Sequence, residues 1–246
     1  MVKKYSSFIN LIVVVGILTS FVITAHFRNM IYQTPVTMWA DAAAKSAKKR
    51  RTHENYGQAL STAGILNEAL RQFQTVLALP DDGSVPARDL YREIGVVYFR
   101  MGLFDDAITA WQTGLRLAPF DPSILNNLSV AFIKKQRYDE AEAAVRQALQ
   151  IAPSMPHLLN TLGEILMVKG QYEEAVRSFL TAIQYGPDTP ARYWNAALAL
   201  EKTGRYDKAY EYASRYAAME PNPQLRQQAQ NYLARLQALY FSKRNP

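Results

Sequence analysis

Histidine is the side chain best suited to acid–base and metal chemistry near neutral pH, and this sequence of 246 residues contains His26, His53 and His157. The three histidines are far apart, and the chain has no cysteine to accompany them. A metal site, or a base beside a nucleophile, needs several such groups close together. The glycines do not form the cluster that holds phosphate groups. We therefore expect no catalytic, metal-binding or cofactor-binding residues and predict that the protein is not an enzyme.

Paired acidic residues are the other group that often does chemistry, because two carboxylates can act as acid and base. Here the pairs recur at a regular spacing, as Asp105-Asp106, Asp139-Glu140 and Glu173-Glu174. Each pair falls where a helix is expected to begin, and negative charge is favourable at the N-terminus of a helix. The acidic pairs are therefore predicted to be structural.

The regular spacing extends along most of the chain, as prolines 34 residues apart show: Pro119, Pro153, Pro187 and Pro221. Small residues recur at two places in each unit, namely Gly57, Gly95, Ser129, Gly163 and Ala197, and Ala69, Ala107, Ala141, Ala175 and Ala209. Two helices cross closely only where their side chains are small. Each unit is therefore predicted to hold two antiparallel helices, helix A and helix B. Glycines at 64, 102, 170 and 204 are predicted to end helix A with a positive φ.

A period of 34 residues with this pattern resembles the tetratricopeptide-repeat (TPR) family over residues 50–223. The predicted repeats are 50–83, 88–121, 122–155, 156–189 and 190–223. The resemblance implies an all-α, right-handed solenoid that binds other proteins. Residues 224–246 are predicted to form a half-polar capping helix and a tail.

An uncharged, apolar segment at residues 8–25 precedes the repeats. It approaches the roughly 20 residues that cross a membrane as a helix, so residues 1–31 are predicted to be a transmembrane anchor in contact with lipid. A cleaved signal peptide is the alternative, but the apolar run exceeds the roughly 7–15 residues usual for one. Gly16, Ser20 and Thr24 are spaced by four and lie on one helix face, where a partner transmembrane helix is able to approach, although chance also gives such spacing.

The net charge of +7 arises in residues 1–51, which carry eight basic residues and one acidic residue, whereas residues 52–246 carry 20 of each. A neutral folded part gives no support to nucleic-acid binding. The basic cluster at 45–51 is instead suited to anionic lipid, or is a solvated linker. Lys3 and Lys4 favour a cytoplasmic N-terminus and periplasmic repeats in an inner membrane, whereas the cluster favours the reverse.

The connector, residues 32–49, is predicted to be a helix with Thr34 as its cap and Pro35 in its first turn. It also resembles the junction before the periplasmic TPRs of bacterial O-mannosyltransferase-like membrane proteins, in Arg28-Asn29, Thr37-Met38-Trp39, Asp41, Lys45-Ser46, Arg51, Asn55 and Gly57. Ala47 replaces the proline usual there, and the many spanning helices and acidic catalytic loops of those proteins have no counterpart. The resemblance implies periplasmic repeats but not glycosyl transfer.

Helix A side chains that face away from helix B are predicted to line a concave groove for a partner. The groove residues are Asn55, Arg92, Val96, Phe99, Asn127, Val130, Ile133, Asn160, Met167, Trp194, Asn195 and Leu198. Its apolar centre suits a helix or an extended peptide. Asparagine recurs at the sixth place of three repeats, where an amide binds peptide backbone or merely fills a polar surface.

These features predict a membrane-anchored scaffold that joins proteins in a bacterial envelope assembly. The alternative is a permanent structural subunit of a membrane complex. The two differ in whether partners exchange or co-purify at a fixed ratio.

Overall fold

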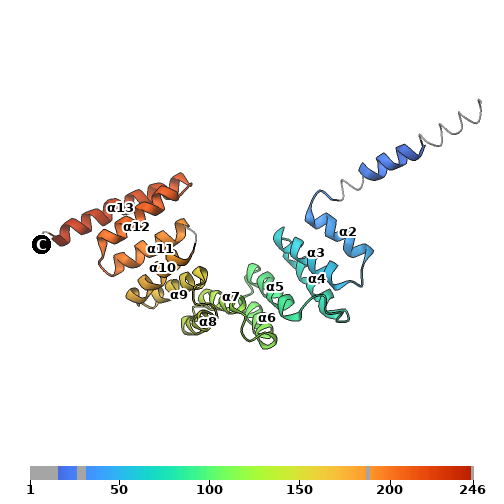
Figure 1. Cartoon of the computed structure of the whole chain (residues 1–246), viewed down its shortest axis with the longest axis horizontal. Helices are drawn as coiled ribbons and strands as arrows, with labels where there is room; N and C mark the ends of the chain where they lie inside the picture. Colours follow the sequence, from blue (N-terminus) through green and yellow to red (C-terminus); the bar gives the residue numbers. More distant parts are fainter. Residues whose placement is uncertain (1–15, 27–31, 187–188, 245–246) are drawn as a thin grey trace, which may run out of the picture. The chain divides into compact units, whose positions relative to one another are not determined.

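The computed structural model describes residues 16–26, 32–186 and 189–244, and every regular element in these ranges is helical (Figure 1). The predicted all-α class is therefore confirmed. After a helical stretch at 16–26 the helices are α2 (Pro35–Lys45), α3 (Arg50–Thr62), α4 (Leu66–Ala78), α5 (Ala87–Arg100), α6 (Phe104–Leu117), α7 (Pro122–Lys134), α8 (Tyr138–Ile151), α9 (Pro156–Val168), α10 (Tyr172–Tyr185), α11 (Pro190–Lys202), α12 (Tyr206–Met219) and α13 (Pro223–Arg244).

The chain forms two compact units, Met1–Met101 and Gly102–Pro246. In unit 1, α3 pairs with α4, and α2 packs on α3. In unit 2, α7 pairs with α8, α9 with α10, and α11 with α12, and each pair packs on the next. The final helix, α13, packs on α12.

The predicted anchor at 8–25 lies largely outside the described residues. Residues 16–26, which belong to it, are helical and exposed. Within the part of the chain that the structure describes, no helix is long and apolar enough to span a membrane. The anchor therefore stays a prediction.

The turns between helix A and helix B depend on one residue with a positive φ. Gly64, Gly102, Gly170 and Gly204 have φ between +71° and +82°, as the sequence predicts. In the repeat formed by α7 and α8 this place is taken by Gln136, with φ +59°. A side chain in this region is strained, by roughly 1–2 kcal/mol per residue, and the following Arg137 N–H donates to Phe132 O at 2.9 Å to close the turn.

The crossing of helices A and B is tight at the eighth place of the repeat. A Cβ atom added to Gly163 of α9 would lie 2.6 Å from Cζ of Phe179 on α10. One added to Gly57 of α3 would lie 2.6 Å from Cε1 of Phe73 on α4. Both phenylalanines are fully buried. A small residue on helix A therefore accommodates a large one on helix B.

Helix α2 begins as the sequence predicts. Thr34 Oγ1 accepts from the Thr37 N–H at 3.2 Å, Thr37 Oγ1 accepts from the Thr34 N–H at 3.3 Å, and Pro35 occupies the first turn. These contacts satisfy backbone donors that the helix itself leaves without partners.

Two residues of the basic cluster after α2, Arg50 and Arg51, make contacts within unit 1, whereas Lys48 and Lys49 are exposed. Arg50 is only 4% exposed. Its Nε donates to Val76 O at 3.2 Å, and its guanidinium pairs with Asp81. Arg51 bonds Ser84 O and Glu54, and Lys45 bonds Asp41. Arg50 and Arg51 thus tie the start of α3 to the long turn after α4 instead of forming a solvated linker or a lipid-binding patch.

Gly163→Ala tests the tight crossing. We expect a loss of about 1–3 kcal/mol in the free energy of unfolding because the new methyl group overlaps the Phe179 ring. Urea unfolding followed by circular dichroism measures it. Phe179→Leu is the partner variant, and the double variant should lose less than the two single losses added together. Additive losses would contradict the contact.

Arg50→Met tests the structural role of the basic cluster. The variant leaves the Val76 carbonyl without its donor in a buried place, so a loss of about 1–3 kcal/mol is expected. The control, Lys49→Met, removes the same charge from an exposed neighbour and should change the stability by less than about 0.5 kcal/mol. Equal effects in thermal unfolding would show that only charge matters.

Candidate partner-binding site

The A helices of unit 2 lie side by side, because α9 contacts both α7 and α11 (Figure 1). Helices α8, α10 and α12 pair with them on the other side. We call the side of α7, α9 and α11 that faces away from α8, α10 and α12 the A face. Residues three, four and seven apart share one side of a helix, so the predicted groove residues of these helices other than Trp194 fall on this face.

Amide side chains are joined across the A face. Asn195 Nδ2 on α11 donates to Asn160 Oδ1 on α9 at 3.1 Å and to Glu164 Oε1 at 3.3 Å. Asn160 Nδ2 also donates to Glu164 Oε1, at 2.6 Å. Two predicted asparagines are therefore brought together, and both donate to the Glu164 carboxylate.

The row of polar side chains that contact one another across the A face continues from α9 to α7. Thr161 Oγ1 lies 3.2 Å from Asn126 Oδ1 and 3.0 Å from His157 O. Thr161 stands at the sixth place of its repeat, where three other repeats have asparagine. Its buried hydroxyl nevertheless lies within hydrogen-bonding distance of Asn126 on the neighbouring repeat. Asn127, the predicted member of the row on α7, lies next to Asn126 and is half-buried.

Apolar side chains accompany the amides. Val130 and Ile133 on α7, Met167 on α9 and Leu198 on α11 are all half-buried. Each follows a polar residue of the row by three, four or seven positions, so it lies on the same face. The A face of unit 2 thus combines ordered amides with apolar surface that water still reaches.

Trp194, also predicted to line the groove, is held in an aromatic cluster. Its ring centroid lies 4.8 Å from that of Tyr216 on α12 and 4.9 Å from that of Tyr232 on α13. Tyr232 Oη donates to Glu201 Oε2 at 2.8 Å. Burial raises the pKa of Tyr232, and the hydrogen bond to Glu201 adds to the increase. Part of the Trp194 surface is therefore committed to joining α13 to the last repeat.

In unit 1 the predicted residues lie on α3 and α5, which contact each other. Asn55, Arg92, Val96 and Phe99 are half-buried. Arg92 pairs with Asp89 at 3.0 Å and with Glu93 at 3.4 Å. Its charge is therefore largely balanced within its own helix.

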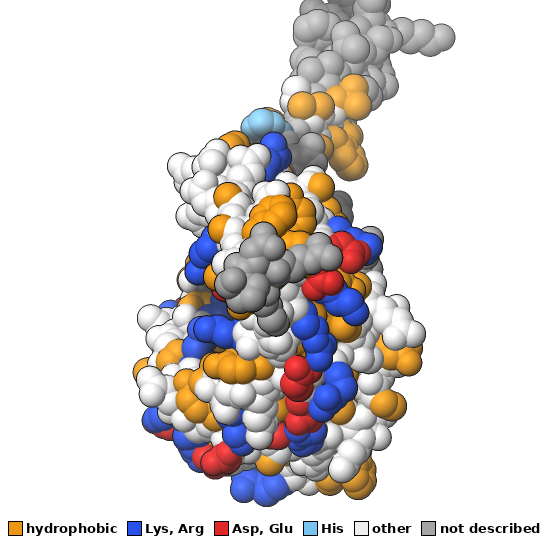
Figure 2. Space-filling view, turned by 90° about the vertical axis from the view of Figure 1, so that its left-hand side faces the viewer, with side chains coloured by type: hydrophobic (Ala, Val, Ile, Leu, Met, Phe, Trp, Pro, Cys, Tyr) orange, Lys and Arg blue, Asp and Glu red, His pale blue; other side chains and the backbone are white. Residues whose placement is uncertain are grey.

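The acidic pairs that begin the B helices have the structural role predicted for them. Lys135 Nζ pairs with Asp105 at 2.6 Å and Lys169 Nζ with Asp139 at 2.7 Å. Lys169 donates hydrogen bonds to Asp139 and Glu142, and these bonds raise the pKa of Lys169. On the face that Figure 2 shows, acidic and basic side chains are interspersed. In the described residues no three metal-ligating side chains come together.

Sequence models of the tetratricopeptide repeat match residues 92–156, 132–200 and 191–223. The matches overlap and together cover more than half of the chain. The chain therefore belongs to the tetratricopeptide-repeat family, and the predicted TPR repeats are confirmed. A comparison with curated protein sequences finds no match.

Several solved structures have a similar fold. A MamA fragment from Desulfovibrio magneticus RS-1 has a TM-score of 0.61 at 16% identity, over 69% of this chain and 94% of that one. YrrB, described as a TPR protein with an unusual peptide-binding site, has a TM-score of 0.58 at 20% identity, over 78% and 97%. Cut9–Hcn1 of the APC/C has a TM-score of 0.67 at 16% identity, over 80% and 38%. At these identities the likeness concerns the fold.

Proposed function

We propose that this protein is a scaffold that holds a peptide segment of another protein on the A face of its repeats. The observation that carries the proposal is the amide row of Asn126, Asn160 and Asn195 beside half-buried apolar side chains. Amides positioned by neighbours lose little freedom when they bind a peptide backbone, and apolar contacts supply affinity. The peptide-binding site described for YrrB, a protein of similar fold, is consistent with this use of the repeats.

The proposal assigns no chemistry to the protein. Proteins of its family act through surface contact, and Asp105, Asp139 and Glu173 at the starts of α6, α8 and α10 are occupied by ion pairs. Substrate, cofactor and metal are therefore not part of the proposed function.

Membrane attachment is the second part of the proposal. The apolar residues 8–25 anchor the chain in an inner membrane, and the repeats lie in the periplasm, where they join proteins of an envelope assembly. The supporting observations are the length of the uncharged run and the lysines at positions 3 and 4. The basic cluster is the opposing argument, but it begins roughly 20 residues beyond the apolar segment, at the edge of the range over which such charges count.

A permanent structural subunit is the second candidate. The half-buried apolar residues of the A face favour this candidate, because a stable complex would keep them covered. Purification from detergent extract separates the two, because a subunit co-purifies with its neighbours at fixed ratio whereas a scaffold yields partners that exchange.

Ile133→Asp and Met167→Asp test the A face. Each variant places a charge where an apolar contact worth roughly 1.5–3 kcal/mol is expected, so capture of the partner should fall at least about tenfold. Quantitative mass spectrometry of co-purified proteins measures it. Gln147→Asp, on the exposed surface of α8, is the matched control and should leave capture unchanged. Full capture by both A-face variants with native circular dichroism would place the partner elsewhere.

A reporter that is active only in the periplasm, fused after Pro246, tests the anchor and its orientation. It should be active and should sediment with membranes. Replacing Val14 and Ile17 by Arg should release the fusion from the membrane, because charge in the hydrocarbon core costs several kcal/mol. A mature N-terminus near His26, found by mass spectrometry, would show a cleaved signal peptide instead. Activity only of a cytoplasmic reporter would reverse the orientation.

A further inference from the structure

In unit 2, an ion pair between the first turn of a helix B and a cation after the next helix A recurs in three successive repeats. The equivalent positions for the fourth helix B hold no cation. The first-turn acids Asp105 on α6, Asp139 on α8 and Glu173 on α10 are spaced by 34 residues, and each pairs with a cation that follows the next helix A. The cations are Lys135, Lys169 and Arg205. The fourth acid of the series is Asp207 on α12.

Among the side chains described in residues 189–242, no cation lies within ion-pairing distance of Asp207. The position that corresponds to Lys135 and Lys169 is Gln237, and the position that corresponds to Arg205 is Leu239. Here α13 continues as a helix through both places instead of ending in a turn. Gln237 is polar but uncharged and Leu239 is apolar, so neither equivalent position supplies a cation to the Asp207 carboxylate.

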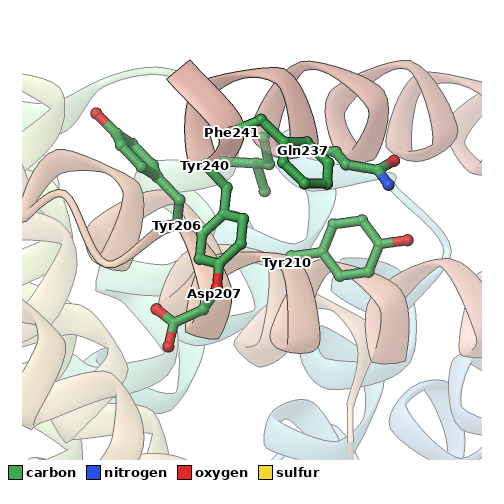
Figure 3. A pocket seen from close by; sticks show the side chains of 7 residues that line it. Tyr206, Asp207, Tyr210, Gln237, Tyr240 and Phe241 are labelled. Atoms are coloured by element: carbon green, nitrogen blue, oxygen red, sulfur yellow. The ribbon is translucent and has the colours of Figure 1, made fainter. Parts of the chain in front are cut away.

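Asp207 lies in a pocket of about 340 Å³ between the start of α12 and the last turns of α13. Aromatic side chains dominate its lining: Tyr206, Tyr210, Tyr240 and Phe241, with Leu236 and Gln237. In Figure 3 the Tyr240 ring descends from α13 toward α12 between Tyr206 and Tyr210, and the Asp207 carboxylate lies beside these rings.

Two lining side chains expose much apolar surface. Phe241 is 55% exposed and Tyr210 is 40% exposed, although both lie at this one pocket. The aromatic lining distinguishes Asp207 from an acid that only stabilises the start of a helix. An aromatic face attracts a cation, and an adjacent carboxylate adds an ion pair with the same cation.

We propose that this pocket binds a lysine or arginine side chain of a protein partner. The incoming cation takes the position that Lys135 and Lys169 occupy in the preceding repeats, next to the carboxylate of Asp207, and the tyrosine rings cover its alkyl stem. This site is separate from the A face, and it makes the end of unit 2 a second place of contact that selects basic segments.

Peptide binding to the intact chain in detergent solution tests the proposal. The probes are heptapeptides of glycine alternating with arginine, with lysine, or with glutamate, and isothermal titration calorimetry gives the Kd. The arginine or lysine peptide should bind, and the glutamate peptide should not. Asp207→Asn, which removes only the charge, should weaken binding about tenfold, because it removes the ion pair. Undiminished binding by Asp207→Asn, or equal binding of the glutamate peptide, would overturn the proposal.

Gln237→Lys provides the sharper variant, because it restores the missing cation from within the chain. It should block peptide binding about as strongly as Asp207→Asn does. Gln228→Lys adds the same charge on the opposite side of α13, nine residues away, and should leave the Kd unchanged. If the two lysine variants weakened peptide binding equally, general charge repulsion would explain the effect, and this result would also overturn the proposal. Ile133→Asp should keep full peptide binding, so this test does not depend on the A face.

Discussion

The close crossing of helix A with helix B is the contact on which the arrangement of the repeats depends. At Gly163 there is no room for even one methyl group beside Phe179, and Gly57 meets Phe73 in the same way. The last repeat reaches the crossing with two small residues, Ala197 and Ala213, both fully buried. Because each crossing fixes the distance and angle within a pair, it also fixes the surface on which the next helix A packs. The A face results from the repetition of this helix crossing along the repeats.

The sequence predicts this level of structure well because the information is local and repeated. A period of 34 residues, small residues at fixed places and glycines with positive φ are sufficient to define helix pairs. The details of the site are less predictable because they depend on side chains from different repeats. Thr161 breaks the asparagine row in the sequence pattern, but its hydroxyl lies at hydrogen-bonding distance from Asn126 one repeat earlier. Trp194 has groove spacing, but α13 supplies Tyr232 to stack against it.

The basic cluster shows the same difference between pattern and environment. Charges counted along the chain place Arg50 in a solvated or lipid-facing stretch, whereas the fold buries it against the turn that follows α4. A guanidinium has five donors and is therefore able to join a backbone carbonyl and a carboxylate at once. The extra residues in this first, irregular repeat create the long turn that accepts those donors. The Arg50 charge is therefore part of the packing of unit 1, whereas Lys48 and Lys49 remain exposed.

The end of a solenoid obeys different rules from its interior. Within the array, a surface residue such as Lys135 is constrained because a carboxylate of the preceding repeat faces it. Such exposed pairs add little stability individually. On α13, Arg235 still pairs with Glu201 of the last repeat, but no further repeat packs on that helix in the described chain. Here α13 needs only to cover the aromatic cluster of the last repeat with Ala229 and Tyr232. Positions 237–241 are therefore open to selection for contact with another molecule, and they line the pocket in which the Asp207 carboxylate and four aromatic rings come together.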